Sequence, residues 1–180
     1  MMSERGCLTV RHVLAGEHDQ LRALRLAALL ADPDAFGTTH ARTLGLPAQR
    51  WRTQAQQSQS GTQSRTFIVV DADGTWVGMA LVRADDDRPG AAMLNGMWVA
   101  SSARGQGAAA LLCDACAGWA RAHDFSELVL AVVVTNAQAL RAYERAGFEV
   151  ISRQVYVAGD RTLDEFTMVR ALSAQHTSAR

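Results

Sequence analysis

The sequence contains no lysine: all eighteen basic residues among its 180 residues are arginines, and eighteen acidic residues balance them. The formal net charge is zero and no run of basic residues occurs, so the electrostatic footprint of a nucleic-acid-binding protein is missing. Long apolar runs are also missing, because the longest, residues 128–134, is too short to cross a bilayer. We therefore expect neither a nucleic acid nor a membrane as a partner.

Cysteine is scarce, and its odd count of three argues against a disulfide framework. Cys113 and Cys116 have the spacing of a metal or redox pair, but they fall inside a predicted helix without a second pair or a nearby histidine. We interpret them as packing residues and expect no metal. The first residues show no signal-peptide core, so the expected location is cytoplasmic.

The length predicts a single domain, residues 1–172, followed by a disordered tail, residues 173–180. Hydrophobic periodicity and turn residues predict an α/β fold in which strands and helices alternate. Residues 35–46 are expected to form a loop or short turn, and residues 58–64 a mobile connection. The expected strands are residues 8–13, 66–71, 76–83, 93–99, 128–134, 148–157 and 163–171, and the expected helices are residues 18–30, 47–57, 107–123 and 137–146.

Residues 94–109 combine a strand, a turn with two glycines and the start of an Ala/Leu-rich helix. In such a segment several backbone N–H groups converge in front of a helix N-terminus, where the helix dipole favours an anion. Gly105 and Gly107 allow a phosphate to approach the main chain, and Arg104 adds a guanidinium suited to phosphate oxygens. The pattern predicts a pyrophosphate-binding turn.

This turn admits two other interpretations. It could be a plain surface turn whose glycines serve only a tight strand–helix junction. Residues 105–110 also satisfy a dinucleotide Gly-x-Gly-x-x-Ala pattern, which needs an acidic residue after the following strand to hold the ribose. The only acidic residue near that distance, Glu127, precedes its strand, so a nicotinamide cofactor is disfavoured.

The turn and a second block downstream resemble the GNAT superfamily of N-acetyltransferases. Arg104, Gly107 and Ala109 match its acyl-CoA signature. The second block, at the usual distance, consists of Asn136, Ala139, Tyr143 and then Gly147-Phe148. The specific resemblance covers about residues 91–150.

The resemblance implies a mixed, mostly antiparallel sheet of about seven strands, with helices on both faces. Its fourth and fifth strands would splay apart, and the pantetheine arm of acetyl-CoA would pair in the gap like a short strand. The main chain near Met97 and Val99 would bind the arm, and the amides from Arg104 to Ala109 the pyrophosphate. The implied cofactor-binding residues are Met97, Trp98, Val99, Arg104, Gly105, Gln106, Gly107, Ala108, Ala109, Asn136 and Tyr143.

Tyr143 is the expected catalytic residue, since its phenol can protonate the thiolate that leaves when the thioester is cleaved. It lies seven residues after Asn136 and so shares a helix face with it. By the same analogy Asn136 would bond the arm or its thioester, and the Met97 N–H would stabilise the oxyanion. As alternatives, Tyr143 could be a packing residue and Asn136 a helix N-cap, a role compatible with binding.

A general base is not identifiable. Many family members carry a Glu or His on the fourth strand, where this sequence has Asn95 and Gly96. His40, Asp34 and Glu165 are candidates through a water chain, but each is more typical of a solvated residue, so none is assigned.

The predicted function is acetyl transfer from acetyl-CoA to a primary amine of a small molecule within a ternary complex. Acetylation of a peptide or protein amine is the alternative, and a catalytically silent acyl-CoA-binding module is the competing class. The acceptor should be selected by the first two helices, residues 31–46 and the last hairpin. A homodimer is compatible with the sequence.

Overall fold

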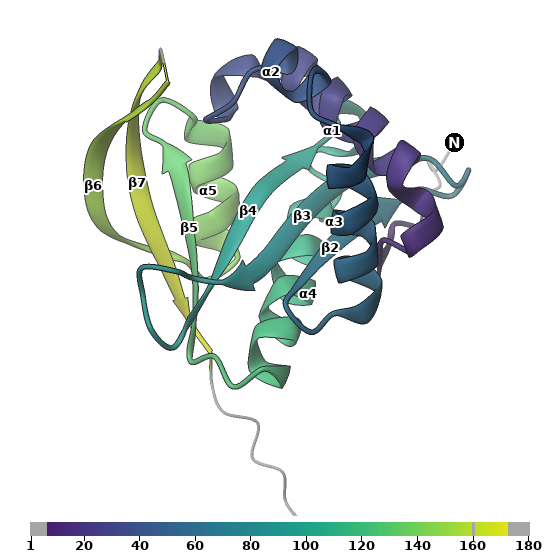
Figure 1. The fold of residues 1–180 in the computed structure, drawn as a ribbon. Coiled ribbons are helices and arrows are strands. Elements are labelled where there is room, and N and C mark those ends of the chain that lie inside the picture. The colour runs from purple at the N-terminus through teal and green to yellow at the C-terminus, as the bar shows by residue number, and fades with distance from the viewer. Residues whose placement is uncertain (1–6, 160, 173–180) are drawn as a thin grey trace, which may run out of the picture.

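The computed structural model describes residues 7–159 and 161–172, and the expected tail at residues 173–180 lies outside them. A seven-stranded sheet in the order β1-β2-β3-β4-β5-β7-β6 carries helices on both faces (Figure 1). The strands are β1 (Thr9–His12), β2 (Ser64–Val70), β3 (Trp76–Ala84), β4 (Ala91–Val99), β5 (Glu127–Val133), β6 (Glu149–Ala158) and β7 (Arg161–Ala171). The α-helices are α1 (His18–Ala31), α2 (His40–Leu44), α3 (Ala48–Ser60), α4 (Ala108–Ala122) and α5 (Ala137–Arg145), with 3-10 turns at Ala15–Glu17, Pro33–Ala35 and Ser101–Ala103.

The sheet opens between β4 and β5, as expected. These two strands run parallel and pair only at their beginnings, where Ala91, Ala92 and Met93 face Glu127, Leu128 and Val129. Every other pair of neighbouring strands in the described part is antiparallel. Beyond Met93 the edge of β4 is therefore free of β5, which confirms the predicted mixed, splayed sheet.

A β-bulge distorts β4 just before its end. In the pairing of β4 with β3, Asn95 lies opposite Leu81 and Trp98 lies opposite Met79. Two residues of β4, Gly96 and Met97, therefore face the single residue of β3 between Met79 and Leu81. Gly96 has a φ of 57°, in the left-handed region that glycine enters without a Cβ clash. The bulge locally disrupts the pairing with β3 beside the splayed edge.

Each face of the sheet has its own apolar core, because successive residues of a strand point to opposite faces. Ile68 of β2 packs into the core beneath α1 and α3, whereas its neighbour Val69 packs into the core beneath α4 and α5. The predicted core stripe of α4 is confirmed at Leu112, Cys116 and Trp119, which are buried.

Two expectations for the segment before β2 were wrong. Residues 35–46 contain α2, where the Thr39 hydroxyl accepts a hydrogen bond from the Arg42 N–H at 3.2 Å. In the expected mobile connection, α3 continues to Ser60 and Ser58 is fully buried. The Ser58 hydroxyl donates to the Thr66 carbonyl at 3.0 Å and accepts from its N–H at 3.1 Å, which joins the helix to β2. Local composition could not reveal this contact.

None of the helices in the described residues has the length and apolar character needed to cross a membrane.

Candidate functional site

A cleft of about 420 Å³ lies where β4 and β5 have separated, between the end of β4, the start of α4 and one side of α5. All the predicted site residues line it except Gln106, whose side-chain amide instead donates to the Ser102 carbonyl at 2.6 Å. The fold thus gathers the glycine-bearing turn, Asn136 and Tyr143 around one space. Their individual roles stay predictions.

The turn before α4 presents a row of free backbone amides. The first hydrogen bond of the helix runs from the Leu111 N–H to the Gly107 carbonyl at 3.1 Å. Gly105 and Gly107 have φ angles of 76° and 91°, and a Cβ added at either would meet no atom within 4 Å. Among the described residues, no protein acceptor bonds the N–H groups of Gly105, Gly107, Ala108, Ala109 and Ala110. Such an open row of donors at a helix N-terminus suits a phosphate or diphosphate.

The Arg104 side chain is already engaged by the protein. Its Nε donates to the Val99 carbonyl at 3.0 Å, and its Nη2 donates to the Asp32 carboxylate at 2.5 Å. The same carboxylate accepts from Trp98 Nε1 at 2.7 Å. Arg104 therefore ties the turn to the ends of α1 and β4, and only part of its guanidinium remains for a ligand.

Sequence reasoning did not predict two charged residues that line the cleft, Arg145 and Asp32. Asp32 appears in the sequence as part of a helix-breaking Asp-Pro-Asp segment, and the structure places it at the C-cap of α1. Its partner Arg104 is 72 residues away along the chain, so no local pattern indicated the pair.

Tyr143 is nearly buried, with 8% of its surface exposed, and its ring meets Phe148 edge-on at a centroid distance of 5.9 Å. Burial, and then the nearby Cys113 and Cys116, raise the pKa of its phenol above the ordinary value. The group is therefore held in the protonated form, which is the form that can donate a proton. It both packs in the core and lines the cleft.

Asn136 caps α5, since its side-chain oxygen accepts from the Ala139 N–H at 3.1 Å. It also lines the cleft, so the cap and the predicted binding role are compatible.

The cysteine pair belongs to the core. Cys113 and Cys116 are fully buried, and burial raises the pKa of the Cys113 thiol to about 12 and that of Cys116 well above its ordinary value. A protonated, buried thiol is a poor nucleophile, which disfavours a covalent acyl-cysteine route. Within residues 7–159 and 161–172 no group of three or more His, Cys, Asp or Glu residues has the arrangement of a metal site.

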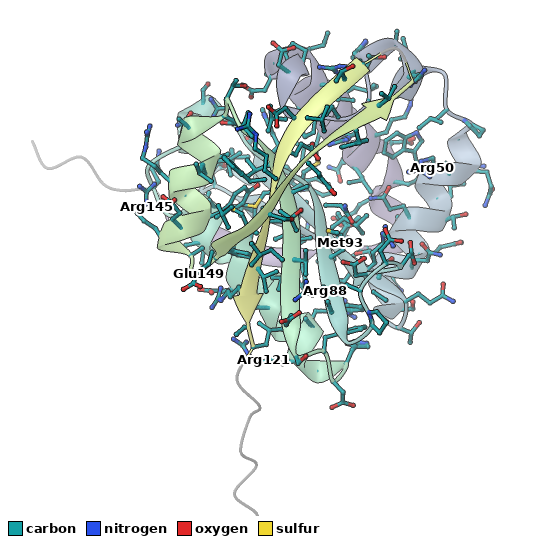
Figure 2. The ribbon with its side chains drawn as sticks, turned by 90° about the vertical axis from the view of Figure 1, so that its left-hand side faces the viewer. Arg50, Arg88, Met93, Arg121, Arg145 and Glu149 are labelled. Atoms are coloured by element: carbon teal, nitrogen blue, oxygen red, sulfur yellow. The ribbon has the colours of Figure 1, made fainter. Side chains whose placement is uncertain are left out.

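A second cavity of about 430 Å³ lies on the other side of the sheet, and we call it the α1–α3 pocket. Its lining comes from α1, α2, α3 and the neighbouring loops, together with β2, β3 and β4, but from no described residue of the last hairpin. Asn95 and Gly96 line this pocket and Met97, the next residue, lines the cleft. The two cavities therefore adjoin the bulge of β4 from opposite faces of the sheet. Figure 2 shows Arg50 of α3 and Arg145 of α5 on opposite sides of the sheet.

The three candidates for a general base differ in their surroundings. Asp34 is exposed and lies 3.4 Å from Arg161, and His40 is a partly exposed residue at the start of α2. Glu165, expected to be solvated, is buried with 7% of its surface exposed, so that expectation was wrong. Burial raises the pKa of its carboxyl group. Its pairing with Val133 places it at the end of β5, where the sheet is open.

A family model, the acetyltransferase (GNAT) family, matches residues 11–148, while no curated protein matches the chain significantly. Among solved structures, a GCN5-related N-acetyltransferase from Kribbella flavida is 27% identical, with a TM-score of 0.72 over 92% of this chain and 98% of that chain. Spermidine N-acetyltransferase from Vibrio cholerae, in complex with CoA and spermine, is 18% identical, with a TM-score of 0.71 over 93% and 96%.

A putative acetyltransferase from Salmonella typhimurium, solved with its cofactor acetyl-CoA, is also 18% identical, with a TM-score of 0.75 over 97% of this chain and 98% of that chain. The family match spans both the glycine-bearing turn and the whole block from Asn136 to Phe148. The chain therefore belongs to the acetyltransferase (GNAT) family.

Proposed function

We propose that this protein transfers an acetyl group from acetyl-CoA to a primary amine of a small molecule. The observation that carries the proposal is the set of amides without a partner in the described residues, those of Gly105 and of Gly107 to Ala110, in a cleft that also contains Tyr143. The residues fit the co-substrate: the amides and the space above both glycines suit its diphosphate, and the unpaired edge of β4 suits its amide-bearing arm. Bound there, acetyl-CoA supplies the thioester.

The reaction joins the amine nitrogen to the acetyl carbonyl carbon and breaks the bond from that carbon to the CoA sulfur. The acceptor nitrogen starts as an ammonium that loses one proton before it attacks, and the tetrahedral intermediate loses a second proton from the same nitrogen. The sulfur leaves as a thiolate that gains one proton, so one proton is released overall. Tyr143 is the proposed proton donor, because its raised pKa keeps it protonated beside the cleft. The Met97 N–H, next to the bulge, is the proposed oxyanion donor.

For the proton that the ammonium loses, we propose Glu165, acting through water. It is the buried member of the three candidates, and the register places it at the open end of β5. Its raised pKa brings its proton affinity closer to that of a base working near neutral pH.

A small acceptor is supported by the size of the α1–α3 pocket, about 430 Å³, which is in the range of small-molecule sites. The similar spermidine N-acetyltransferase, solved with spermine, is consistent with such an acceptor. A peptide or protein amine is the alternative acceptor, and a silent acyl-CoA-binding module the alternative class. A cytoplasmic location and a homodimer remain expectations from the sequence.

Thiol release from acetyl-CoA, followed with a thiol reagent across a panel of primary amines, tests the proposal. We expect release that depends on one class of small amine, together with mass-spectrometric detection of the acetylated amine. Binding of acetyl-CoA without amine-dependent release by any amine, including a peptide with a free N-terminus, would leave the silent module as the better account.

A further inference from the structure

The α1–α3 pocket is lined by arginines and, among the described residues, by no carboxylate. The arginines are Arg25 of α1, Arg50 of α3 and Arg83 of β3. Arg83 is neutralised from outside the pocket, because its Nη1 donates to Asp86 at 2.6 Å. Arg25 and Arg50 therefore supply the unbalanced positive charge.

Arg25 and Arg50 form no ion pair within residues 7–159 and 161–172, whereas Arg11, Arg83, Arg88, Arg104, Arg153, Arg161 and Arg170 each pair with an Asp or Glu. The lack of a carboxylate partner is not special to the pocket, because Arg22, Arg65 and Arg145, among others, form no ion pair in the same residues. Arg25 is distinguished by the lowered pKa that burial gives its guanidinium.

Arg25 is held in place rather than free in solvent. Its guanidinium carbon lies 4.4 Å from the centroid of the Phe36 ring, and its Nη1 atom is buried without a protein acceptor. Burial, and then the charge of Arg50, lower the pKa of Arg25 to about 10, so it remains a cation at neutral pH. A fixed, partly desolvated cation without a partner favours an anionic ligand.

Two more buried polar atoms without a partner line the same pocket. Trp51 Nε1 is a donor and Asn95 Oδ1 is an acceptor, and neither has a hydrogen-bond partner in the described protein. A buried polar group without a partner is costly, so such groups converging on one cavity indicate a polar ligand. A ligand that satisfies all three groups must accept hydrogen bonds from Arg25 and Trp51 and donate one to Asn95.

The donor and acceptor sides of this site are close to each other and to the cleft. Asn95 immediately precedes Gly96, and a Cβ built on Gly96 would lie 3.3 Å from Arg25 Nη1. Met97, the next residue, lines the cleft that contains the glycine-bearing turn and Tyr143. A ligand amine at Asn95 would therefore lie beside the bulge of β4, two residues before Met97, with an oxyanion close beside it.

We propose that the α1–α3 pocket selects an amine that carries an oxyanion close to its nitrogen, as an α-amino acid does. This inference rests on the proposed acetyl transfer. Arg25, Arg50 and Trp51 bind the oxyanion, and Asn95 Oδ1 accepts from the amine. Polyamines, which bring only positive charge, are rejected by the two arginines.

The first test compares acceptors matched in shape but not in charge. Thiol release from acetyl-CoA is measured with α-amino acids and their carboxamides, with aminoalkylphosphonates, and with spermidine. We expect kcat/KM for the best amino acid or phosphonate to exceed that of its neutral counterpart by about 100-fold, since two charge-assisted contacts are lost with the charge. The comparison of aminoalkylphosphonates with α-amino acids shows whether a phosphonate or a carboxylate is the preferred oxyanion. Equal or better use of carboxamides or spermidine would overturn the inference.

The second test uses two arginines of one helix. Arg50→Gln removes a pocket charge, whereas Arg52→Gln removes a charge from an exposed residue of α3 that does not line the pocket. Arg50→Gln should raise KM for the anionic acceptor about tenfold, with a smaller change in kcat and no change in the dissociation constant of CoA. Arg25→Gln should act in the same direction with a larger effect. Identical acceptor kinetics in Arg50→Gln and Arg52→Gln would contradict the inference.

Failure of this inference is distinguishable from failure of the proposed function. Acetylation of neutral or cationic amines in preference to anionic ones would leave the transferase intact and reject the anionic acceptor. If no amine releases thiol while CoA binds, the transferase proposal fails. The pocket is then judged by thermal shift with the same panel in the presence of CoA: a rise in Tm with anionic amines that Arg50→Gln abolishes supports anion binding, and no rise with any anionic amine overturns it.

Discussion

The cleft and the α1–α3 pocket have nearly equal volumes, about 420 and 430 Å³, yet they are built to recognise charge in different ways. In the cleft the donors include main-chain amides, Arg104 is paired with Asp32, and Arg145 also lines the cavity. In the pocket the donors are side chains, and Arg25 has no carboxylate partner among the described residues. Backbone amides suit the phosphates of a co-substrate that all members of a family share, because they do not depend on side-chain identity. Side chains can differ between members, so they suit the recognition of the acceptor of one protein.

The largest effect should come from filling the space above the turn. Gly107→Leu places a side chain where the free amides point and forces a residue with a Cβ to a φ of 91°. We expect the dissociation constant of CoA to rise about 100-fold or more, since several charge-assisted hydrogen bonds are lost together. Gly118→Leu, on an exposed helical position of α4, is the control. Unchanged CoA affinity in folded Gly107→Leu would mean that the turn does not bind the diphosphate.

Removing the proton donor should separate catalysis from binding. Tyr143→Phe keeps the packing against Phe148 but deletes the hydroxyl, so kcat should fall about 100-fold while the dissociation constant of CoA changes little. Tyr156→Phe, at the other tyrosine of the chain, should behave like the unmodified protein. Parallel losses in kcat and CoA affinity would make Tyr143 a structural residue.

Glu165→Gln should change activity and stability in opposite directions. The proposed base acts when it is ionised, so the rate should rise with pH through the raised pKa of Glu165. The variant should lose this rise and have a kcat about tenfold lower. The carboxyl group has a higher pKa folded than unfolded. The stability it contributes is therefore present below the unfolded pKa and is lost as pH rises through the folded pKa.

Thermal unfolding and pH–rate profiles of Glu165→Gln check both effects. The variant should be at least as stable as the parent at neutral pH, where an ionised buried carboxylate is unfavourable. A variant that is less stable at neutral pH and keeps the pH–rate profile would show that Glu165 is structural.

The smallest effect should come from leaving Arg104 of the cleft without its carboxylate partner, as Arg25 is in the pocket. Asp32→Asn removes the counter-charge of Arg104 while keeping a side chain that can accept from Trp98. The freed guanidinium should tighten CoA binding about threefold and make it more sensitive to salt. Titrations at two salt concentrations measure this. Weaker binding would show that Asp32 orients Arg104 rather than competing with the ligand for it.

The same contrast explains what could be predicted from the sequence. The glycine-bearing turn and the Asn136–Tyr143 pair are local patterns, and hydrophobic alternation predicted the strands. The open β4–β5 gap was predicted from the family resemblance alone. The Asp32–Arg104 pair and the Ser58–Thr66 contact join segments that are distant in the sequence, so secondary-structure propensity and motif spacing could not predict them. The burial of Glu165 could not be predicted in this way either, because it depends on the whole sheet.

The central claim is that the amides from Gly105 to Ala110 hold the CoA diphosphate beside Tyr143. Titration of ¹⁵N-labelled protein with CoA, and separately with pantetheine, tests it directly by the amide chemical shifts. The account predicts large shifts at Gly105, Gly107, Ala108, Ala109 and Ala110 with CoA and small ones with pantetheine, which has no diphosphate. Equal shifts with both ligands, or CoA-induced shifts confined to residues elsewhere, would contradict it.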